Sequence, residues 1–328
     1  MEQELFIGID IGGTNTRIAL IDDSGRILLV RKVPTEIGLG TPQVSRRLAA
    51  ECRSLMDAAA GFFGRVVAVG LGAAGRIDAA RGMVVFSPNL PSMRDYPLAA
   101  ELEKNLAIPV VLENDANVYG IGESWVGSGK DIENWIGLTL GTGVGGCLIL
   151  GKRIWQGDGA GFAGEIGHMT IHPEGPACAC GSKGCLETFS SGRALKEGVA
   201  AAIAAGTLRE GPLYESWKNG SLTPETVYRA ATEGNALAQA LFDRMGRALG
   251  IALASLFNVL GIRHAIIGGG VSASWDRFIG PLRESLARHS GMFDPKEVSV
   301  VRSALGDDAA LLGAGELARR AARESRRQ

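Results

Sequence analysis

Two glycine-rich turns between apolar runs hold the first residues whose types suggest chemistry. One is Asp10-Ile-Gly-Gly-Thr-Asn-Thr-Arg17, and the other, in the second half of the chain, is Leu140-Gly-Thr-Gly-Val-Gly-Gly146. Adjacent glycines let backbone N–H groups converge on an anion, and each threonine adds a hydroxyl donor. A plain hairpin turn explains either motif alone, but two such turns in corresponding places favour two phosphate cradles. The residues predicted to form them are Gly12, Gly13, Thr14, Asn15, Gly141, Thr142 and Gly143.

Three flanking features extend this prediction of a nucleotide site. Asp10 ends an otherwise apolar run, where its carboxylate suits a magnesium ion held through water beside phosphates. Arg17 adds positive charge. Gly269 and Gly270 follow the apolar run at Ile266 and would allow the flat face of a nucleoside to approach, which is a weak signal by itself. Neither turn matches the dinucleotide fingerprint or the lysine-bearing P-loop.

A carboxylate follows another apolar run, Val110–Leu112, in the sequence Glu113-Asn114-Asp115. Asp115 alone reads most simply as the cap of a helix that begins at Ala116. Beside two phosphate cradles, a different role is favoured, in which Asn114 orients a hydroxyl and Asp115 accepts its proton. Phosphoryl transfer depends mainly on positioning and charge stabilisation, so a single base is sufficient.

A cluster of cysteines lies in a stretch without apolar periodicity. Cys178, Cys180 and Cys185 follow His168, and three thiolates with one imidazole suit a closed tetrahedral zinc site. Buried free thiols and a disulfide are the alternatives, but crowding in a polar turn and the lack of a signal peptide disfavour them. Cys52 and Cys147 lie in apolar patterns and are predicted to belong to the core.

Two carboxylates flank this cluster. Glu165 precedes His168 by three residues, and Glu187 follows Cys185 by two. Solvated surface carboxylates are the simple alternative. A zinc knot would fix the loop so that Glu165, His168 and Glu187 present acceptors to vicinal hydroxyls of a sugar, because every sugar hydroxyl is also a donor.

The elements that must position these residues follow a pattern that occurs twice. Runs at 5–10, 17–21 and 27–33 predict three antiparallel strands, with a hairpin turn at Asp22-Asp-Ser-Gly25. Runs at 135–140 and 144–150 repeat the glycine turn between strands, and each set is followed by alternating strands and helices. We therefore expect a mixed α/β fold with two similar lobes around a central cleft.

Composition excludes several classes of protein. The 328 residues include 34 basic and 35 acidic side chains, and this balance argues against nucleic acid as a partner. The longest apolar run, about 13 residues at 248–260, is too short to span a membrane, and the acidic N-terminus lacks the features of a signal peptide. We expect a soluble cytoplasmic protein. Glycine, at 47 residues, is about twice its usual share of ~7%.

In these motifs the chain resembles the ROK family of sugar kinases and related repressors, and within it the ATP-dependent bacterial glucokinases. Besides the two glycine turns, the resemblance rests on motifs spread over residues 5 to 315: Gly72-Ala-Ala-Gly75, Ser87-Pro-Asn-Leu-Pro91, Glu113-Asn-Asp-Ala-Asn117, Gly164-Glu-Ile-Gly-His168 and the run from Cys178 to Glu187 followed by Ser191-Gly192.

The resemblance implies an actin-like ATPase fold of ribonuclease-H-like lobes. The small lobe would comprise residues 1–115 and a returning helix at about 305–328, and the large lobe, 116–304, would carry the zinc loop and the oligomer interface. By this resemblance, matching positions of the chain are expected to provide the catalytic base, the sugar contacts, the zinc ligands and the contacts to Mg-ATP. They are Asp115 as base; Gly75, Asn89, Asn114, Glu165, His168 and Glu187 for sugar; His168, Cys178, Cys180 and Cys185 for zinc; Asp10 and the two glycine turns for Mg-ATP.

Three classes of function remain to be weighed. The first is transfer of the ATP γ-phosphate to the 6-hydroxyl of a hexose, glucose before N-acetylmannosamine, N-acetylglucosamine or fructose, by a homodimer or homotetramer. The second is a sugar-sensing repressor, which a first strand at Leu5 leaves no room for, since such proteins carry a preceding DNA-binding domain. The third is a non-catalytic interaction protein on the same scaffold, which the predicted zinc knot and sugar carboxylates disfavour.

Overall fold

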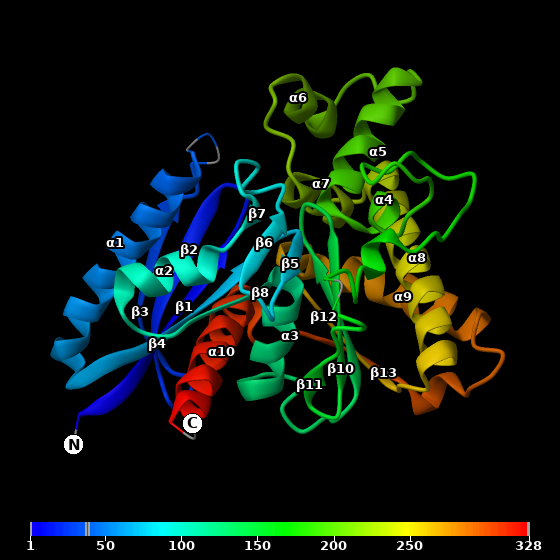
Figure 1. The fold of residues 1–328 in the computed structure, drawn as a ribbon. Coiled ribbons are helices and arrows are strands. Elements are labelled where there is room, and N and C mark those ends of the chain that lie inside the picture. Colours follow the sequence, from blue (N-terminus) through cyan, green and yellow to red (C-terminus); the bar gives the residue numbers. More distant parts are fainter. Residues whose placement is uncertain (1, 37, 39, 160, 327–328) are drawn as a thin grey trace. The chain divides into compact units, whose positions relative to one another are not determined.

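The computed structural model describes residues 2–36, 38, 40–159 and 161–326 (Figure 1). The chain divides into two compact units. Unit 1 comprises Met1–Glu133, Cys147–Gly164 and Ser303–Gln328, and unit 2 comprises Asn134–Gly146 and Glu165–Arg302. Unit 1 therefore also contains residues 116–133 and 147–164, beyond the small lobe expected from the sequence.

The sheet of unit 1 has the strand order β3-β2-β1-β4-β8. Strands β1, β2 and β3 are antiparallel neighbours, whereas β4 and β8 run parallel to β1. The three strands and the hairpin predicted from the N-terminal sequence are confirmed. The bounds are β1 (Gln3–Ile11), β2 (Asn15–Asp22), β3 (Ile27–Pro34), β4 (Gly64–Ala73) and β8 (Val110–Asn114).

Helices cover both faces of this sheet, because alternate residues of β1 are buried on opposite sides. Leu5, Ile7 and Ile9 share one core cluster with residues of α1 (Thr41–Ala59) and α2 (Leu98–Leu106). Phe6 packs instead against α10 (Ala309–Ser325), beside which α3 (Asp115–Val126) lies. At Gly70 of β4 an added Cβ would stand 1.9 Å from the carbonyl oxygen of Ala314, so glycine is required for α10 to approach the sheet. Figure 1 shows α1 and α2 on one side of the strands and α10 on the other.

Unit 1 also contains elements that the sequence analysis did not predict. A small antiparallel sheet has the order β5-β6-β7, and helix α2 precedes β8. The strands are too short for hydrophobic periodicity to reveal them. Their bounds are β5 (Arg76–Asp78), β6 (Met83–Phe86) and β7 (Arg94–Tyr96).

The second large sheet repeats the plan of the first, with the order β11-β10-β9-β12-β13. As in the first sheet, three strands that are consecutive in the sequence, here β9, β10 and β11, lie together on one side of the sheet. The other two strands, β12 and β13, run parallel to β9. The predicted repeat of the strand pattern is thus confirmed. The bounds are β9 (Trp135–Leu140), β10 (Val144–Leu150), β11 (Arg153–Ile154), β12 (His264–Gly268) and β13 (Ser299–Arg302).

The helices of unit 2 centre on α8 (Ala236–Leu260), which includes the predicted buried apolar run. Gly246 and Gly250 allow α9 (Trp275–Arg288) to pack closely, since added Cβ atoms would stand 2.4 and 2.5 Å from carbonyl oxygens of α9. No helix in the described part of the chain is both long and apolar enough to cross a membrane. The remaining helices are α4 (Glu187–Ser190), α5 (Gly192–Ala204), α6 (Pro212–Lys218) and α7 (Pro224–Thr232).

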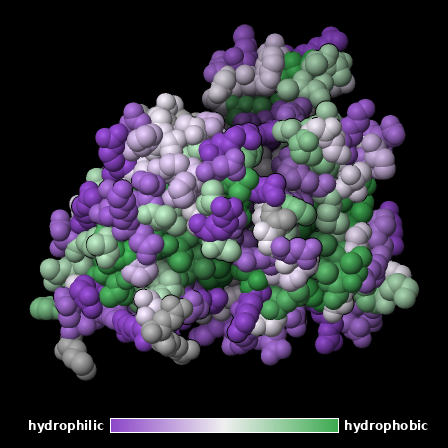
Figure 2. All heavy atoms as spheres, viewed as in Figure 1, coloured by the Kyte–Doolittle hydropathy of each residue, from purple (hydrophilic) through white to green (hydrophobic). Residues whose placement is uncertain are grey.

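The ends of two helices and one face of the surface can be described in the same way. Gly40 is the N-cap residue of α1, and the hydroxyl of Thr41 at its first position donates to the carbonyl oxygen of Ser92. The predicted closing helix is confirmed as α10, although residues 327–328 of the expected range lie outside the described residues. On the face drawn in Figure 2, hydrophilic residues are spread over the surface with hydrophobic residues between them.

Candidate functional site

The first glycine turn joins β1 to β2 in unit 1. The N–H of Gly12 donates to the carbonyl oxygen of Asn15 over 3.1 Å, which closes the turn. A Cβ at Gly12 would lie 2.8 Å from that oxygen, so the tight turn requires glycine there. Gly12, Gly13 and Asn15 are half-buried and Thr14 is exposed, so the backbone of the turn is accessible to a ligand.

Asp10 lies one residue from the end of β1 and pairs with Arg17 across the hairpin. Burial, and next the charge of Asp115, raise the pKa of Asp10 to about 6, while Arg17 opposes the shift. A half-buried carboxylate with a raised pKa beside a second carboxylate is a suitable ligand for a divalent cation. Arg17 itself donates to Asp308 and to the carbonyl oxygen of Asp307, both over 2.5 Å, so its charge is shared with the segment before α10.

Asp115 is the first residue of α3, one position earlier than the sequence indicated. The helix cap is Asn114, whose side-chain oxygen accepts from the N–H groups of Ala116 and Asn117. Capping therefore does not account for the choice of aspartate at position 115. Burial raises the pKa of Asp115, although a backbone hydrogen bond from Ala116 opposes the shift. A carboxylate with a raised pKa is a stronger base.

Glu113 is a residue whose role the sequence analysis missed. Its buried carboxylate accepts hydrogen bonds from the N–H of Asn114 (2.8 Å), from Nδ2 of Asn117 (3.0 Å) and from Nε2 of Gln156 (2.5 Å). These bonds fix the turn that carries Asn114 and Asp115. The signal in the sequence was a charged residue at the end of a buried strand, which needs several donors to offset its desolvation.

Two further predicted sugar contacts lie in unit 1. The carbonyl oxygen of Gly75 accepts a hydrogen bond from Nδ2 of Asn114 over 3.1 Å, so these two residues are brought together. Gly75 has φ +105°, and an added Cβ would stand 2.3 Å from the carbonyl oxygen of Phe86. Asn89 lies beside the first glycine turn, where its Nδ2 donates to the carbonyl oxygen of Ile11 over 3.3 Å.

The second glycine turn, in unit 2, borders a cavity of about 280 Å³. Gly141 donates to the carbonyl oxygen of Gly143 and accepts from the N–H of Gly192 at the start of α5. Gly270 lines the same cavity, and Gly269, with φ +82°, packs against the backbone of Leu140. The structure therefore brings the second turn and the third glycine motif to one place within unit 2.

The wall of this cavity contains residues that the sequence analysis did not select. Lys196 and Arg193 come from α5, and Pro224 and Tyr228 come from α7. A cavity lined by an aromatic ring, a proline and two cations suits a base with an attached phosphate chain. No sequence motif marks them, because they converge from two helices that are separated in the sequence by α6 and its flanking loops.

The predicted Cys3His set is gathered in unit 2. The ligand atoms of His168, Cys178, Cys180 and Cys185 all lie within 4.8 Å of one another. The Sγ atoms of Cys180 and Cys185 are 3.7 Å apart, and two sulfurs at ~2.3 Å from a tetrahedral zinc are separated by about 3.8 Å. The set is therefore compatible with structural zinc. Gly181 and Gly184 have positive φ, as a tight knuckle requires.

The pKa values of the three thiols are shifted in different directions. Burial raises the pKa of Cys178 and of Cys185, whereas a backbone hydrogen bond with Ser182 lowers the pKa of Cys180. A zinc ion would hold all three as thiolates. Cys52 and Cys147 are fully buried in apolar elements, as predicted.

Glu165 and Glu187 flank His168 on opposite ring nitrogens. Oε2 of Glu165 lies 3.8 Å from Nε2, and Oε1 of Glu187 lies 4.0 Å from Nδ1. Nδ1 also lies 3.7 Å from the sulfur of Cys178, so Nδ1 faces the cysteines and Nε2 faces Glu165. An added Cβ at Gly143 would stand 2.7 Å from Oε2 of Glu187, which places this carboxylate beside the second glycine turn.

Comparison with known proteins gives a family for this arrangement. The model of the ROK family matches residues 6–321. A glucokinase of Streptomyces coelicolor is 37% identical over 320 residues, covering 96% of this chain and 98% of that protein, and a glucokinase of Halalkalibacterium halodurans is 34% identical over 323 residues, covering 97% and 96%. The chain belongs to the ROK family.

A solved structure extends the comparison to three dimensions. The ROK family glucokinase from Streptomyces griseus, in complex with glucose and AMPPNP, is 35% identical, with a TM-score of 0.79 over 96% of this chain and 99% of that one. The predicted fold class, a mixed α/β fold of the actin-like ATPase type, is confirmed.

Proposed function

We propose that this protein is an ATP-dependent glucokinase, which transfers the γ-phosphoryl group of Mg-ATP to the 6-hydroxyl of glucose. The observation that carries the proposal is similarity to glucokinases over nearly the whole chain, at 34 and 37% identity. The half-buried Asp115, held by the hydrogen bonds around Asn114 and Glu113, supports a catalytic rather than a regulatory role.

In this proposal Asp115 is the general base. Its carboxylate accepts the proton of the sugar 6-hydroxyl as the oxygen forms its bond to the γ-phosphorus. The bond from that phosphorus to the β–γ bridging oxygen breaks, and ADP leaves with the electron pair. Burial raises the pKa of Asp115, and this brings the base closer to the pH at which the enzyme works.

The nucleotide is assigned to the two glycine turns. Backbone N–H groups of Gly12, Gly13, Thr14 and Asn15 would bind one part of the phosphate chain, and Gly141, Thr142 and Gly143 the other. The nucleoside would occupy the cavity bordered by Gly270, with Lys196 and Tyr228 as added contacts. Asp10 would hold magnesium, which when bound neutralises charge on the phosphates.

The sugar is assigned to two sets of hydrogen-bonding residues. Asn114, with Gly75 and Asn89, would bind some of its hydroxyls, and Glu165, His168 and Glu187 would bind others. Structural zinc on His168 Nδ1 and the three cysteines would leave Nε2 of His168 for the sugar, consistent with the side to which each nitrogen faces.

The lobes and the assembly complete the proposal. Unit 1 is assigned to the small lobe, and unit 2, which carries the Cys3His cluster, to the large lobe, through which homodimers or tetramers would form. Light scattering of the purified protein tests the assembly, and a single species at the mass of one chain would contradict it.

The substrate is tested by measuring ADP release with ATP and glucose, mannose, fructose, N-acetylglucosamine or N-acetylmannosamine. Glucose is expected to give the highest kcat/KM, with a product that glucose-6-phosphate dehydrogenase oxidises. A higher kcat/KM for an N-acetylhexosamine would replace the sugar in this proposal. No sugar-dependent ADP release with any of the five would contradict kinase activity itself.

A further inference from the structure

Thr35 lies directly after β3 and against the first glycine turn, with only 5% of its surface exposed. Its N–H donates to the carbonyl oxygen of Thr14 over 2.9 Å, and its hydroxyl donates to the carbonyl oxygen of Gly12 over 2.7 Å. Thr35, which follows the turn by about twenty residues in the sequence, therefore forms two hydrogen bonds with it.

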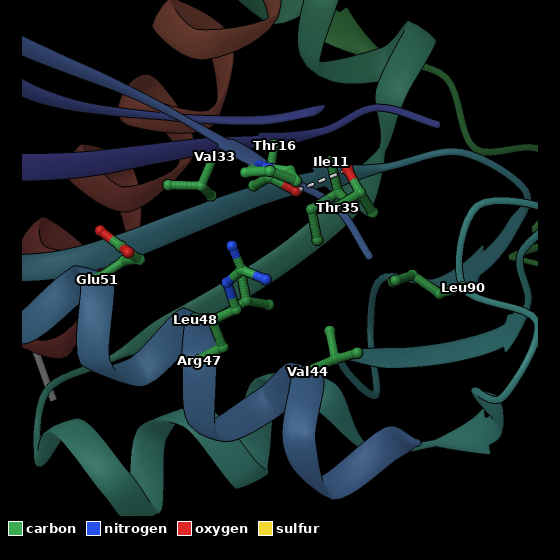
Figure 3. A pocket seen from close by; sticks show the side chains of 10 residues that line it. Ile11, Thr16, Val33, Thr35, Val44, Arg47, Leu48, Glu51 and Leu90 are labelled. Atoms are coloured by element: carbon green, nitrogen blue, oxygen red, sulfur yellow. Dashed lines mark hydrogen bonds between the residues drawn. The ribbon is translucent and has the colours of Figure 1, made fainter. Parts of the chain in front are cut away.

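A second threonine completes a chain of hydrogen bonds. Oγ1 of Thr16 lies 3.1 Å from Oγ1 of Thr35, and Figure 3 shows the two side chains joined by this bond. A hydroxyl has one proton, and Thr35 gives its proton to Gly12. Thr16 must therefore be the donor to Thr35, and the chain runs from Thr16 through Thr35 to the Gly12 carbonyl. Every hydroxyl proton in this buried pair has a partner.

The bond to Gly12 determines which way the next amide points. The carbonyl of Gly12 and the N–H of Gly13 belong to one planar trans peptide, in which they point in opposite directions. Because Thr35 holds that carbonyl, the N–H of Gly13 points away from Thr35. Among the residues that the structure describes, none accepts a hydrogen bond from this N–H, and Gly13 is only half-buried.

Asn89 supports the same turn one peptide earlier. Its Nδ2 donates to the carbonyl oxygen of Ile11, so carbonyls of Ile11, Gly12 and Thr14 are all held by neighbouring residues. Binding of an anion by a backbone turn requires N–H groups fixed in direction before the ligand arrives. The hydrogen bonds from Asn89 and Thr35 hold the N–H groups of the turn in a fixed direction, although neither side chain contacts the ligand in this arrangement.

We propose that Thr35 is a positioning residue for the nucleotide, which orients the free N–H of Gly13 toward a phosphate through its hydrogen bond to the Gly12 carbonyl. The proposal rests on the assignment of this turn to ATP. Thr35 contacts no substrate in it, so its loss should weaken the binding of ATP and leave the binding of glucose nearly unchanged.

Four variants test this. Thr35→Val has the same shape but no hydroxyl, which matters because the cavity beside Thr35, lined by Val33, Val44, Arg47 and Leu48 among others, has only about 10 Å³ (Figure 3). Thr35→Ser restores the hydroxyl. Thr16→Val removes only the donor to Thr35. Ser45→Ala is the matched control, since the buried Ser45 hydroxyl of α1 has no partner among the described residues.

The dissociation constant of Mg-ATP, measured calorimetrically without sugar, and the KM of both substrates are the readouts. Thr35→Val is expected to weaken ATP binding roughly tenfold, with glucose KM within twofold, because one directing hydrogen bond is lost. Thr16→Val is expected to weaken it less than threefold. Thr35→Ser and Ser45→Ala should stay near the unaltered protein. Where Thr35→Val does not fold, Thr35→Ala removes the same bond.

Three results would overturn the inference, and Gly12→Ala distinguishes the first two. A Cβ at Gly12 collides with the turn, so this variant tests the turn itself. Weak ATP binding in Gly12→Ala with normal binding in Thr35→Val would refute the role of Thr35 and leave the cradle in place. Normal ATP binding in both would refute the assignment of the turn to ATP. Equal losses for ATP and glucose in Thr35→Val, without rescue by serine, would indicate a merely structural role.

Discussion

Asp10 offers a direct test of the proposed magnesium site, because keeping an ionised carboxylate at this position lowers the stability of the folded protein. Its pKa is raised from 3.8 to about 6, chiefly by burial, and next by the charge of Asp115. The folded protein therefore binds a proton at this site more tightly than the unfolded chain. The contribution of protonated Asp10 to the free energy of unfolding is fully present at low pH and is lost as the pH rises from about 4 to about 6.

The size of the loss follows from the shift. A difference of about two pKa units, at ~1.4 kcal/mol per unit, is on the order of 3 kcal/mol at pH 8. At pH 5, where the folded-state carboxyl is still mostly protonated, the loss is about half as large. Asp10→Asn has nearly the same shape and never ionises, so it should be more stable than the unaltered protein by about these amounts.

The assay is urea unfolding followed by circular dichroism at pH 5 and pH 8. Magnesium is omitted, and no chelator is added, so that a zinc ion stays in place. Asp57→Asn, a change at an exposed position on α1, is the control and should show no pH-dependent gain. Asp10→Asn should also lose most of its kinase activity, because the gain in stability comes from removing a functional charge.

Two outcomes would refute this reasoning. An Asp10→Asn variant that is less stable than the unaltered protein at pH 8 would mean that the charge is compensated in the folded protein. An increase in the free energy of unfolding that is equal at pH 5 and pH 8 would mean that the effect does not arise from ionisation of Asp10.

Three further predictions concern the base, the residue that fixes it and the metal. Asp115→Asn is expected to lower kcat by roughly 10²–10⁴ while glucose KM changes little, and steady-state rates near those of the unaltered protein would exclude Asp115 as the base. Glu113→Gln replaces an acceptor of three hydrogen bonds, so kcat should fall by about tenfold or more, whereas Glu133→Gln, a change outside this network, should have no effect. Purified protein is expected to contain one zinc per chain by elemental analysis, and its removal should raise glucose KM more than ATP KM; protein without zinc and with normal glucose KM would contradict the knot.

The strands, the repeat and the metal cluster were predictable because each is encoded locally. Apolar runs separated by glycine or Asp-Asp-Ser-Gly turns specify hairpins through backbone geometry over a few residues. The cysteine spacing similarly limits which ligands a short loop brings together, and Gly181 and Gly184 adopt the backbone that such a loop needs. The short strands β5 to β7 were not predicted, because three or four residues are too few to show a reliable hydrophobic periodicity.

The network around the candidate base was not predictable in the same way. Glu113 meets Gln156 across 43 positions, and Arg17 meets Asp308 across 291, so no local pattern relates them. The identity of the cap, Asn114 rather than Asp115, depends on where α3 begins after β8.

The sequence by itself therefore determined the turns, the strand pattern and the types of residue available for chemistry. Only the tertiary structure decided how far each carboxylate is removed from water and which donors meet which acceptors, as with the half-buried Asp10, the buried Glu113 and the Thr35 hydroxyl. The physical reason is that local backbone preferences act between neighbours in the chain, whereas desolvation and hydrogen bonding act between neighbours in space, which the packed fold creates.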